Sequence, residues 1–241
     1  MRNIITLLLL LLSTIMYSSC NGQTKPVGDE PLNLETFTFD IKISDLYPEK
    51  NKSKEYKDFY EIKGTMHSQL VAKDTTYINE FSENKKAIGI EYRQQSSTSI
   101  DTMAVFENQK FQKINVATTL DGKIKAINAV ADELTEQQSG DLLKKLVNKY
   151  GKPKKLKNSW NEKFITYEWI AKNRIIRFVS AYDDESTTMK LVINEEKQTI
   201  ASGEKEPHYV GYLFIVNPAL KDEVFGKMKT GDFVFLDETT D

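Results

Sequence analysis

The chain has 241 residues, of which 33 are Lys or Arg and 35 are Asp or Glu, so its formal net charge at pH 7 is −2. This near-neutral balance argues against a general nucleic-acid-binding protein, which carries a strong basic excess. The composition is that of a folded globular protein, with 39% hydrophobic and 10% aromatic residues. About 200 residues after the N-terminal segment suit one large domain with a real core.

The first twenty residues differ from the rest of the chain. Arg2 provides a positive start, Ile4–Met16 is a mostly apolar run, and Ser18-Ser19-Cys20 follows. The run is too short to cross a bilayer as a helix, which needs about 20 apolar residues. It has the length of the hydrophobic region of a cleavable signal. Two small serines, which suit the entry of the chain into a peptidase site, precede the only cysteine of the chain, Cys20.

This arrangement resembles a bacterial lipoprotein signal peptide that ends in a lipobox. The resemblance implies that residues 1–19 are removed, that the Cys20 thiol carries a diacylglyceryl group, and that the new amine takes a palmitate-type acyl chain. Two or more acyl chains hold a protein stably on a membrane. The alternatives are an ordinary secretory signal with an incidental cysteine, or an uncleaved anchor. Once Cys20 is acylated, no thiol remains for disulfides, thiolate catalysis or metal ligation.

The residues after Cys20 bear on location. The start Cys-Asn-Gly-Gln resembles lipoproteins of the Bacteroidota, and Asn21 in place of Asp implies the outer membrane by the enterobacterial sorting rule. Surface-export signals of the lipoproteins that it resembles place acidic residues soon after the cysteine. The first acids here, Asp29 and Glu30, come nine and ten residues after Cys20, so the resemblance implies a periplasm-facing protein. Residues 20–34 contain glycine and proline among polar residues, and they are predicted to form a lipidated, flexible tether.

Alternating apolar residues predict strands from residue 35 onward. The expected strands cover residues 37–43, 59–66, 88–92, 103–107, 111–118, 123–131, 164–170, 174–181, 189–195 and 209–216, with a possible last edge strand at 233–235. Residues 78–86 are ambiguous. Short turns between alternating strands favour an antiparallel sheet over a parallel one.

Two stretches have helical periodicity. Thr135 and Gln138 resemble a capping box, Leu142 and Leu146 lie on one stripe, and Gly151 is a C-terminal stop. Asn217-Pro218 predicts the start of a short C-terminal helix that ends at Gly231. The predicted fold class is α+β, an antiparallel sheet with one main amphipathic helix (about 135–150) packed on a face. The predicted domains are a main domain over 35–195 and, over 196–241, a linker plus a strand/helix appendage.

Candidate catalytic and metal-binding residues are scarce. His67 and His208 are the only histidines and show no paired ligand pattern, so each is interpreted as a surface or partly buried residue. No nucleophile elbow and no phosphate-binding glycine run is present. Asp183-Asp184-Glu185 lacks the spacing of a calcium loop and is interpreted as a solvated hairpin turn. The sequence predicts no catalytic residue, no metal and no cofactor.

The sharpest local bias is a basic run near the predicted helix C-terminus. Its candidate partner-binding residues are Lys144, Lys145, Lys149, Lys152, Lys154, Lys155 and Lys157, and Lys163 extends the run. They could form a patch for an acidic partner or for anionic lipid headgroups. The simpler alternative is a solvated helix face and a solubilising loop. Trp160, beside the run, is interpreted as a core residue rather than an exposed anchor.

These features support three hypotheses for a protein held on the membrane by lipid on Cys20. The first is a non-enzymatic module that binds or assembles an acidic envelope protein, with no role for nucleic acid. The second is an envelope hydrolase or transferase that uses carboxylates, and the third is an inhibitor or immunity lipoprotein. Two stretches, Asp74-Thr75-Thr76 and Asp101-Thr102-Met103, also resemble the O-glycosylation motif of the Bacteroidota.

Overall fold

The computed structural model describes residues 25–65, 67–78, 83–96, 100–157, 164–186, 191–194 and 199–236. The described fold is mostly antiparallel β with a few helices, which is consistent with α+β. The predictions for the signal peptide, for Cys20, for Trp160 and for Lys163 concern residues outside the described ranges.

The helical segments, with η marking a 3-10 helix, are α2 (Ile43–Leu46), η2 (Glu49–Asn51), α3 (Glu136–Tyr150), η3 (Pro218–Glu223) and η4 (Gly231–Leu236). The first strands are β1 (Leu32–Asn33), β2 (Phe59–Ile62), β3 (Gln69–Ile78), β4 (Lys86–Gln94), β5 (Ala104–Phe106), β6 (Gln109–Phe111), β7 (Lys113–Thr118) and β8 (Ile124–Leu134). The remaining strands are β9 (Lys154–Lys157), β10 (Ile165–Ala171), β11 (Arg174–Asp183), β12 (Leu191–Asn194), β13 (Thr199–Ser202) and β14 (His208–Val216).

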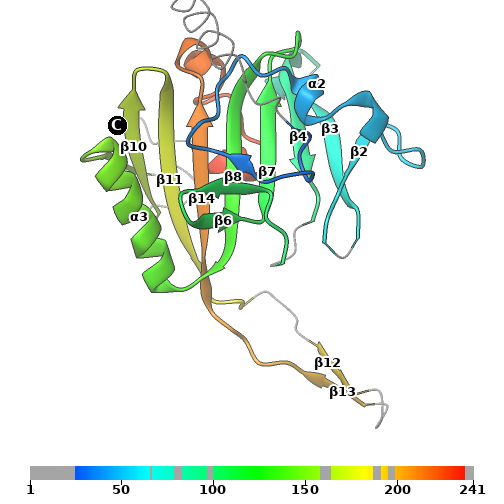
Figure 1. Cartoon of the computed structure of the whole chain (residues 1–241), viewed down its shortest axis with the longest axis vertical. Coiled ribbons are helices and arrows are strands. Elements are labelled where there is room, and N and C mark those ends of the chain that lie inside the picture. The colour runs from blue at the N-terminus through cyan, green and yellow to red at the C-terminus, as the bar shows by residue number, and fades with distance from the viewer. Residues whose placement is uncertain are drawn as a thin grey trace, which may run out of the picture.

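One large sheet organises the molecule. Its nine strands run in the order β2-β3-β4-β7-β8-β14-β11-β10-β9, and every neighbouring pair is antiparallel. A small sheet of β1, β5 and β6 lies across it, and the β12–β13 hairpin extends beyond one end of the strands (Figure 1). The sheet therefore has two ends, one formed by β2 and the other by β9.

The strand β14 lies in the middle of this sheet. It pairs with β11 from Val216 opposite Ile175 to His208 opposite Asp183, and it pairs with β8 on its other side. The prediction that residues 196–241 form a linker and an appendage is therefore wrong. The polar stretch that suggested a linker belongs to the β12–β13 excursion between β11 and β14, and the chain then returns to the centre of the sheet.

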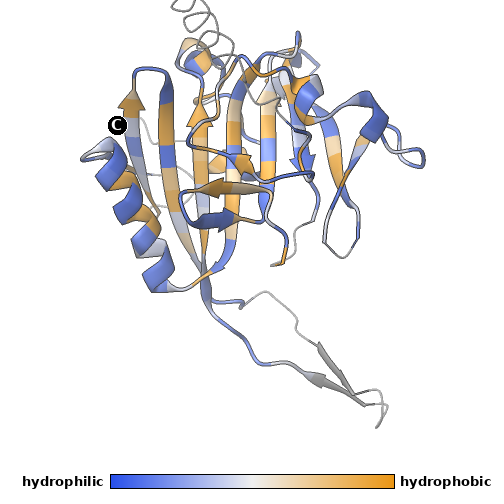
Figure 2. Cartoon of the chain, in the orientation of Figure 1, coloured by the Kyte–Doolittle hydropathy of each residue, from blue (hydrophilic) through white to orange (hydrophobic). Residues whose placement is uncertain are grey.

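The first face of the sheet is covered by α3, by the small sheet and by residues 25–47. The Thr135 hydroxyl accepts a hydrogen bond from the Gln138 N–H, and the Gln138 side-chain oxygen accepts one from the Thr135 N–H, so the capping box is present. Leu142 and Leu146 are fully buried in the same cluster as Phe178 and Trp169. Figure 2 shows hydrophilic colour over the outer side of α3 and hydrophobic colour toward the sheet.

The N-terminal boundary differs from the predicted one. Val27 is 2% exposed and Leu34 is completely buried, while Leu32–Asn33 pairs in parallel with β5. The predicted tether over 20–34 is therefore wrong for the part that is described, because the folded body already begins at Val27. The segment contains short turns between buried apolar residues, and these turns account for the glycine and proline that resemble a linker.

The strand expected over residues 37–43 is also absent. The chain there crosses the sheet as irregular structure and then forms α2. Arg174 explains this path, because its guanidinium donates hydrogen bonds of 2.8 Å and 2.6 Å to the carbonyls of Leu34 and Phe37. The alternating apolar residues belong to a loop and not to a strand, and Phe37 of this loop is buried, with 2% exposure.

The second face is covered by the C-terminal segment, residues 217–236. Val224, Met228, Phe233 and Leu236 are buried against β8, β11 and β14. The predicted short helix is replaced by the 3-10 segment η3 and a turn, and Gly231 begins η4 where an edge strand at 233–235 was expected. Both faces of the sheet are covered, so its central strands are buried on both sides.

Arg177 is the main polar link between this segment and the sheet. Its side chain is buried beside Glu168, with N···O distances of 2.6 and 2.8 Å, and it donates to the Leu236 carbonyl at 2.6 Å. The guanidinium carbon also lies 3.8 Å from the centre of the Phe225 ring. Breaking such a buried pair on one side leaves a charge without a partner.

We expect Arg177→Met to lower the free energy of unfolding by about 3–5 kcal/mol, since Glu168 would then be a buried lone carboxylate. The double variant Arg177→Met/Glu168→Leu should recover much of this loss, because no charge remains buried. Urea unfolding of the two variants and the wild type measures both values. A double variant as unstable as the single one would contradict the explanation.

Candidate functional site

The structure gathers the predicted lysine residues at the β9 end of the sheet. Three of them lie on α3, one lies in the turn after it, and three lie on β9: Lys144, Lys145 and Lys149; Lys152; Lys154, Lys155 and Lys157. The turn is fixed in place, because the Trp169 indole N–H donates to the Gly151 carbonyl at 2.7 Å. We call these seven residues the lysine surface.

Most of the lysine surface faces solvent without a compensating charge. Six of its members are exposed and Lys145 is half-buried, and only Lys149 forms an ion pair with a described acid, Glu35. The hydrogen bond from Lys149 lowers the pKa of Glu35 below its ordinary value. Lys155 lies with its Nζ 5.6 Å from the centre of the Tyr167 ring. Six positive charges thus remain available at one end of the molecule.

The strand β9, which carries three of these lysines, lies at the edge of the sheet. It is the outermost strand of the sheet, so one row of its backbone groups lacks a strand partner among the described residues. Natural proteins place lysine on such edges to prevent unwanted pairing with other chains. The lysines of β9 are therefore expected to disfavour the pairing of another strand along this edge.

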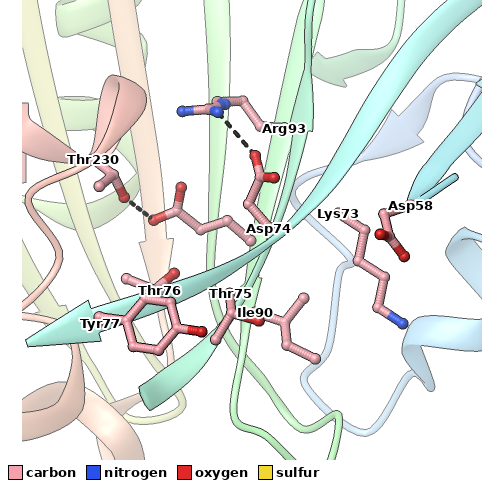
Figure 3. Close-up of a pocket in the computed structure, with 10 residues that line it drawn as sticks. Asp58, Lys73, Asp74, Thr75, Thr76, Tyr77, Ile90, Arg93 and Thr230 are labelled. Atoms are coloured by element: carbon pink, nitrogen blue, oxygen red, sulfur yellow. Dashed lines mark hydrogen bonds and ion pairs between the residues drawn. The ribbon is translucent and has the colours of Figure 1, made fainter. Parts of the chain in front are cut away.

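A polar hollow of about 590 Å³ lies toward the other end of the sheet, on β3 and β4 (Figure 3). It opens where β3 continues past the end of its pairing with β2, which stops at Ala72. Its lining residues carry three acids, two basic groups and three threonines: Asp58, Lys73, Asp74, Thr75, Thr76, Tyr77, Ile90, Glu91, Arg93 and Thr230.

Two carboxylates in this hollow lie on neighbouring strands. Asp74 is directly opposite Glu91 in the β3–β4 register, and Arg93 forms an ion pair with Asp74 at 2.8 Å. Glu91 is only 2% exposed and accepts a hydrogen bond of 2.6 Å from the Thr230 hydroxyl. Burial raises the pKa of Glu91 above its ordinary value, although Thr230 and Arg93 act in the opposite direction.

No local pattern in the sequence predicts this hollow. Asp74 and Glu91 are 17 residues apart in the chain, and Thr230 comes from the opposite terminus, so no local motif joins them. A signal was present in the period-two positions of Glu91 and Arg93 on the predicted strand 88–92 and its extension. The partner strand β3 was not predicted, and without it the cross-strand pair could not be found.

The other candidate residues lie apart from both places. His67 is exposed, and His208 is half-buried with its Nδ1 2.9 Å from the Glu206 carbonyl oxygen. Glu185 is not in a solvated turn as predicted, because it is 6% exposed and accepts a 2.7 Å hydrogen bond from the Glu206 N–H. No group of three or more potential metal-ligating side chains is found among the described residues.

The two stretches that resemble O-glycosylation motifs differ in access. Thr75 is exposed on β3, at the rim of the hollow. Asp101 in the second stretch is 3% exposed and accepts a 2.6 Å hydrogen bond from the Thr65 N–H. The acceptor hydroxyl of the second stretch belongs to Thr102, which is half-buried, so the Thr75 hydroxyl is the more exposed of the two.

The raised pKa of Glu91 predicts how stability depends on pH. The contribution of Glu91 to the stability of the fold is complete below its unfolded-state pKa. This contribution is lost as the pH rises through the higher folded-state pKa. A Glu91→Gln variant stays neutral, so its melting temperature should exceed that of the wild type at about pH 8 and converge with it at about pH 4. Differential scanning calorimetry at the two pH values tests this. The exposed Glu61→Gln is the matched control, and an equal effect of both variants would contradict the prediction.

Among the described residues, no helix is both long and apolar enough to cross a membrane. No protein-family model, no curated protein and no solved structure matches this chain.

Proposed function

We propose that this protein is an α+β envelope lipoprotein, anchored in the outer membrane by lipid on Cys20 and facing the periplasm, that binds an acidic protein partner through the lysine surface. The observation that carries the proposal is the concentration of six lysines without ion-pair partners at one end of the described fold. Such a one-sign surface raises the association rate and selects partners of opposite charge.

The support for these lysines is rigid, which suits a binding surface. We take α3 to be the main amphipathic helix, packed through Leu142 and Leu146 on the first face of the sheet. The residues of β9 are held by pairing with Ile165–Glu168 of β10. Charges fixed on a helix and a strand lose less conformational freedom on binding than charges on a mobile loop.

The lipid anchor is tested directly by Cys20→Ser. We expect the wild type to incorporate labelled palmitate and to fractionate with membranes, because two or more acyl chains hold a protein stably. The variant should incorporate no label and should appear in the soluble envelope fraction. Equal membrane association of both proteins, without label in either, would reject the lipoprotein assignment.

The lysine surface is tested by charge reversal. A variant with Glu at positions Lys152, Lys154, Lys155 and Lys157 should lose the crosslinked partner that a C-terminally tagged wild type captures in intact cells. Reversing four exposed lysines elsewhere, Lys42, Lys110, Lys221 and Lys227, gives the same change in net charge and should leave the crosslink unchanged. Loss in both variants would indicate a general charge effect, and retention in both would reject the lysine surface as the binding site. If the captured partner is a toxic enzyme, the binding is inhibitory.

A second candidate function follows from the hollow on β3 and β4. Its three carboxylates and the raised pKa of the buried Glu91 are features of acid–base sites, and they favour a hydrolase or transferase acting on envelope polymers. Purified protein incubated with cell-wall polymer should then release soluble fragments, and Asp74→Asn or Glu91→Gln should abolish the release. Absence of release by the wild type would reject this candidate.

A further inference from the structure

The chain enters the folded body at the β2 end of the sheet. The Val27 N–H donates to the Leu46 carbonyl at 3.0 Å, and the Val27 side chain is buried. Gly28 follows with φ of +90° and presses against Lys63, whose carbonyl oxygen would lie 2.7 Å from a Cβ at this position. A glycine is therefore required here, and it holds the chain against the end of β2.

This entry point limits how far the body can move from the lipid. Seven residue steps separate Cys20 from Val27, and at about 3.4 Å per step they reach at most about 24 Å. A tether extending to residue 34 would have reached roughly twice as far. The surface around Val27 is thus kept within a short distance of the lipid that carries the anchor.

We infer that this end of the sheet rests on the headgroups of the anchoring membrane, with zwitterionic phosphatidylethanolamine-type lipid as the fitting partner. The contact surface, which we call the entry surface, consists of residues 49–58 together with Asp29, Glu61 and Lys63. The inference rests on the proposed lipid anchor at Cys20 and adds the surface and the lipid chemistry that accompany it.

The side chains of the entry surface fit a headgroup that carries both charges. Four of its lysines are exposed and form no ion pair with a described acid: Lys50, Lys54, Lys57 and Lys63. A hollow of about 500 Å³ beside them is lined by Asp29, Glu55 and Glu61 as well as by lysines. Lysines suit the lipid phosphate and carboxylates suit its ammonium group, so the mixture matches a zwitterionic headgroup better than a purely anionic one.

An exposed aromatic side chain adds an interfacial contact. Tyr56 is 51% exposed, and its ring centre lies 5.9 Å from that of Phe59, which holds it in an edge-on arrangement. Tyrosine favours the membrane interface because its ring is apolar and its hydroxyl is polar. Lysines around it can extend their charged ends to the headgroups while their stems cover the ring.

The arrangement also orients the lysine surface. The β2 end and the β9 end lie at opposite sides of the sheet, as α2 and α3 show in Figure 1. Eight strand spacings of about 4.8 Å separate the two ends by about 38 Å. With the entry surface on the lipid, the lysine surface points away from the anchoring membrane, toward a protein partner and not toward the headgroups of the same bilayer.

The test uses the lipidated full chain in vesicles of phosphatidylethanolamine that contain a headgroup-attached nitroxide lipid. Single fluorophores are attached through Tyr56→Cys, Lys54→Cys or, as the control, Lys155→Cys on β9. The acylated Cys20 does not react with the label, so each variant reports one position. We expect a large loss of fluorescence from positions 54 and 56 and none from position 155.

Each other result has a definite meaning. If position 155 loses as much fluorescence as position 56, or more, the inferred orientation is wrong although the anchor stands. If mass spectrometry finds no lipid on Cys20, the proposed lipid anchor is wrong, whatever the fluorescence shows. If vesicles of purely anionic lipid give a stronger loss at position 56 than phosphatidylethanolamine does, the inferred headgroup chemistry is wrong.

Discussion

The pairing of β14 with both β8 and β11 makes the nine strands one continuous sheet. The chain first builds β2, β3, β4, β7 and β8, and later α3, β9, β10 and β11. Only β14 joins these two groups into one sheet. Its residues Leu213 and Ile215 enter the core of one face while Phe214 and Val216 enter the core of the other, so a single strand connects both hydrophobic clusters.

The polar groups on the second face have a structural purpose that explains why so many are buried. Arg177 donates a hydrogen bond to the Leu236 carbonyl, and Glu91 accepts one from the Thr230 hydroxyl. The Asn115 side-chain amide donates to Asp232 at 2.8 Å. Each lies on a strand of the sheet and binds the C-terminal segment. Buried polar groups need such partners, and these contacts fix the path of a segment that has little regular hydrogen bonding of its own.

The two ends of the sheet differ in the chemistry of their exposed side chains. The β9 end carries lysines with few acids, whereas the β2 end mixes lysines with carboxylates and exposes Tyr56. We propose a protein partner for the first and lipid headgroups for the second. A body fixed to the membrane at one end and charged at the other would present its binding surface at a constant distance from the lipid.

Local signals in the sequence were enough to predict most strands, the capping box at Thr135 and the antiparallel class of fold, because periodicity and caps depend on near neighbours. The remaining features depend on contacts between distant segments, which only the folded structure shows. Tertiary structure turned residues 37–43 into a loop held by Arg174, placed β14 at the centre of the sheet, and formed β9 from a lysine run whose pattern lacks apolar alternation. It also brought together Asp74, Glu91 and Thr230, which no short-range pattern can pair, because strand register is set by contacts between distant segments.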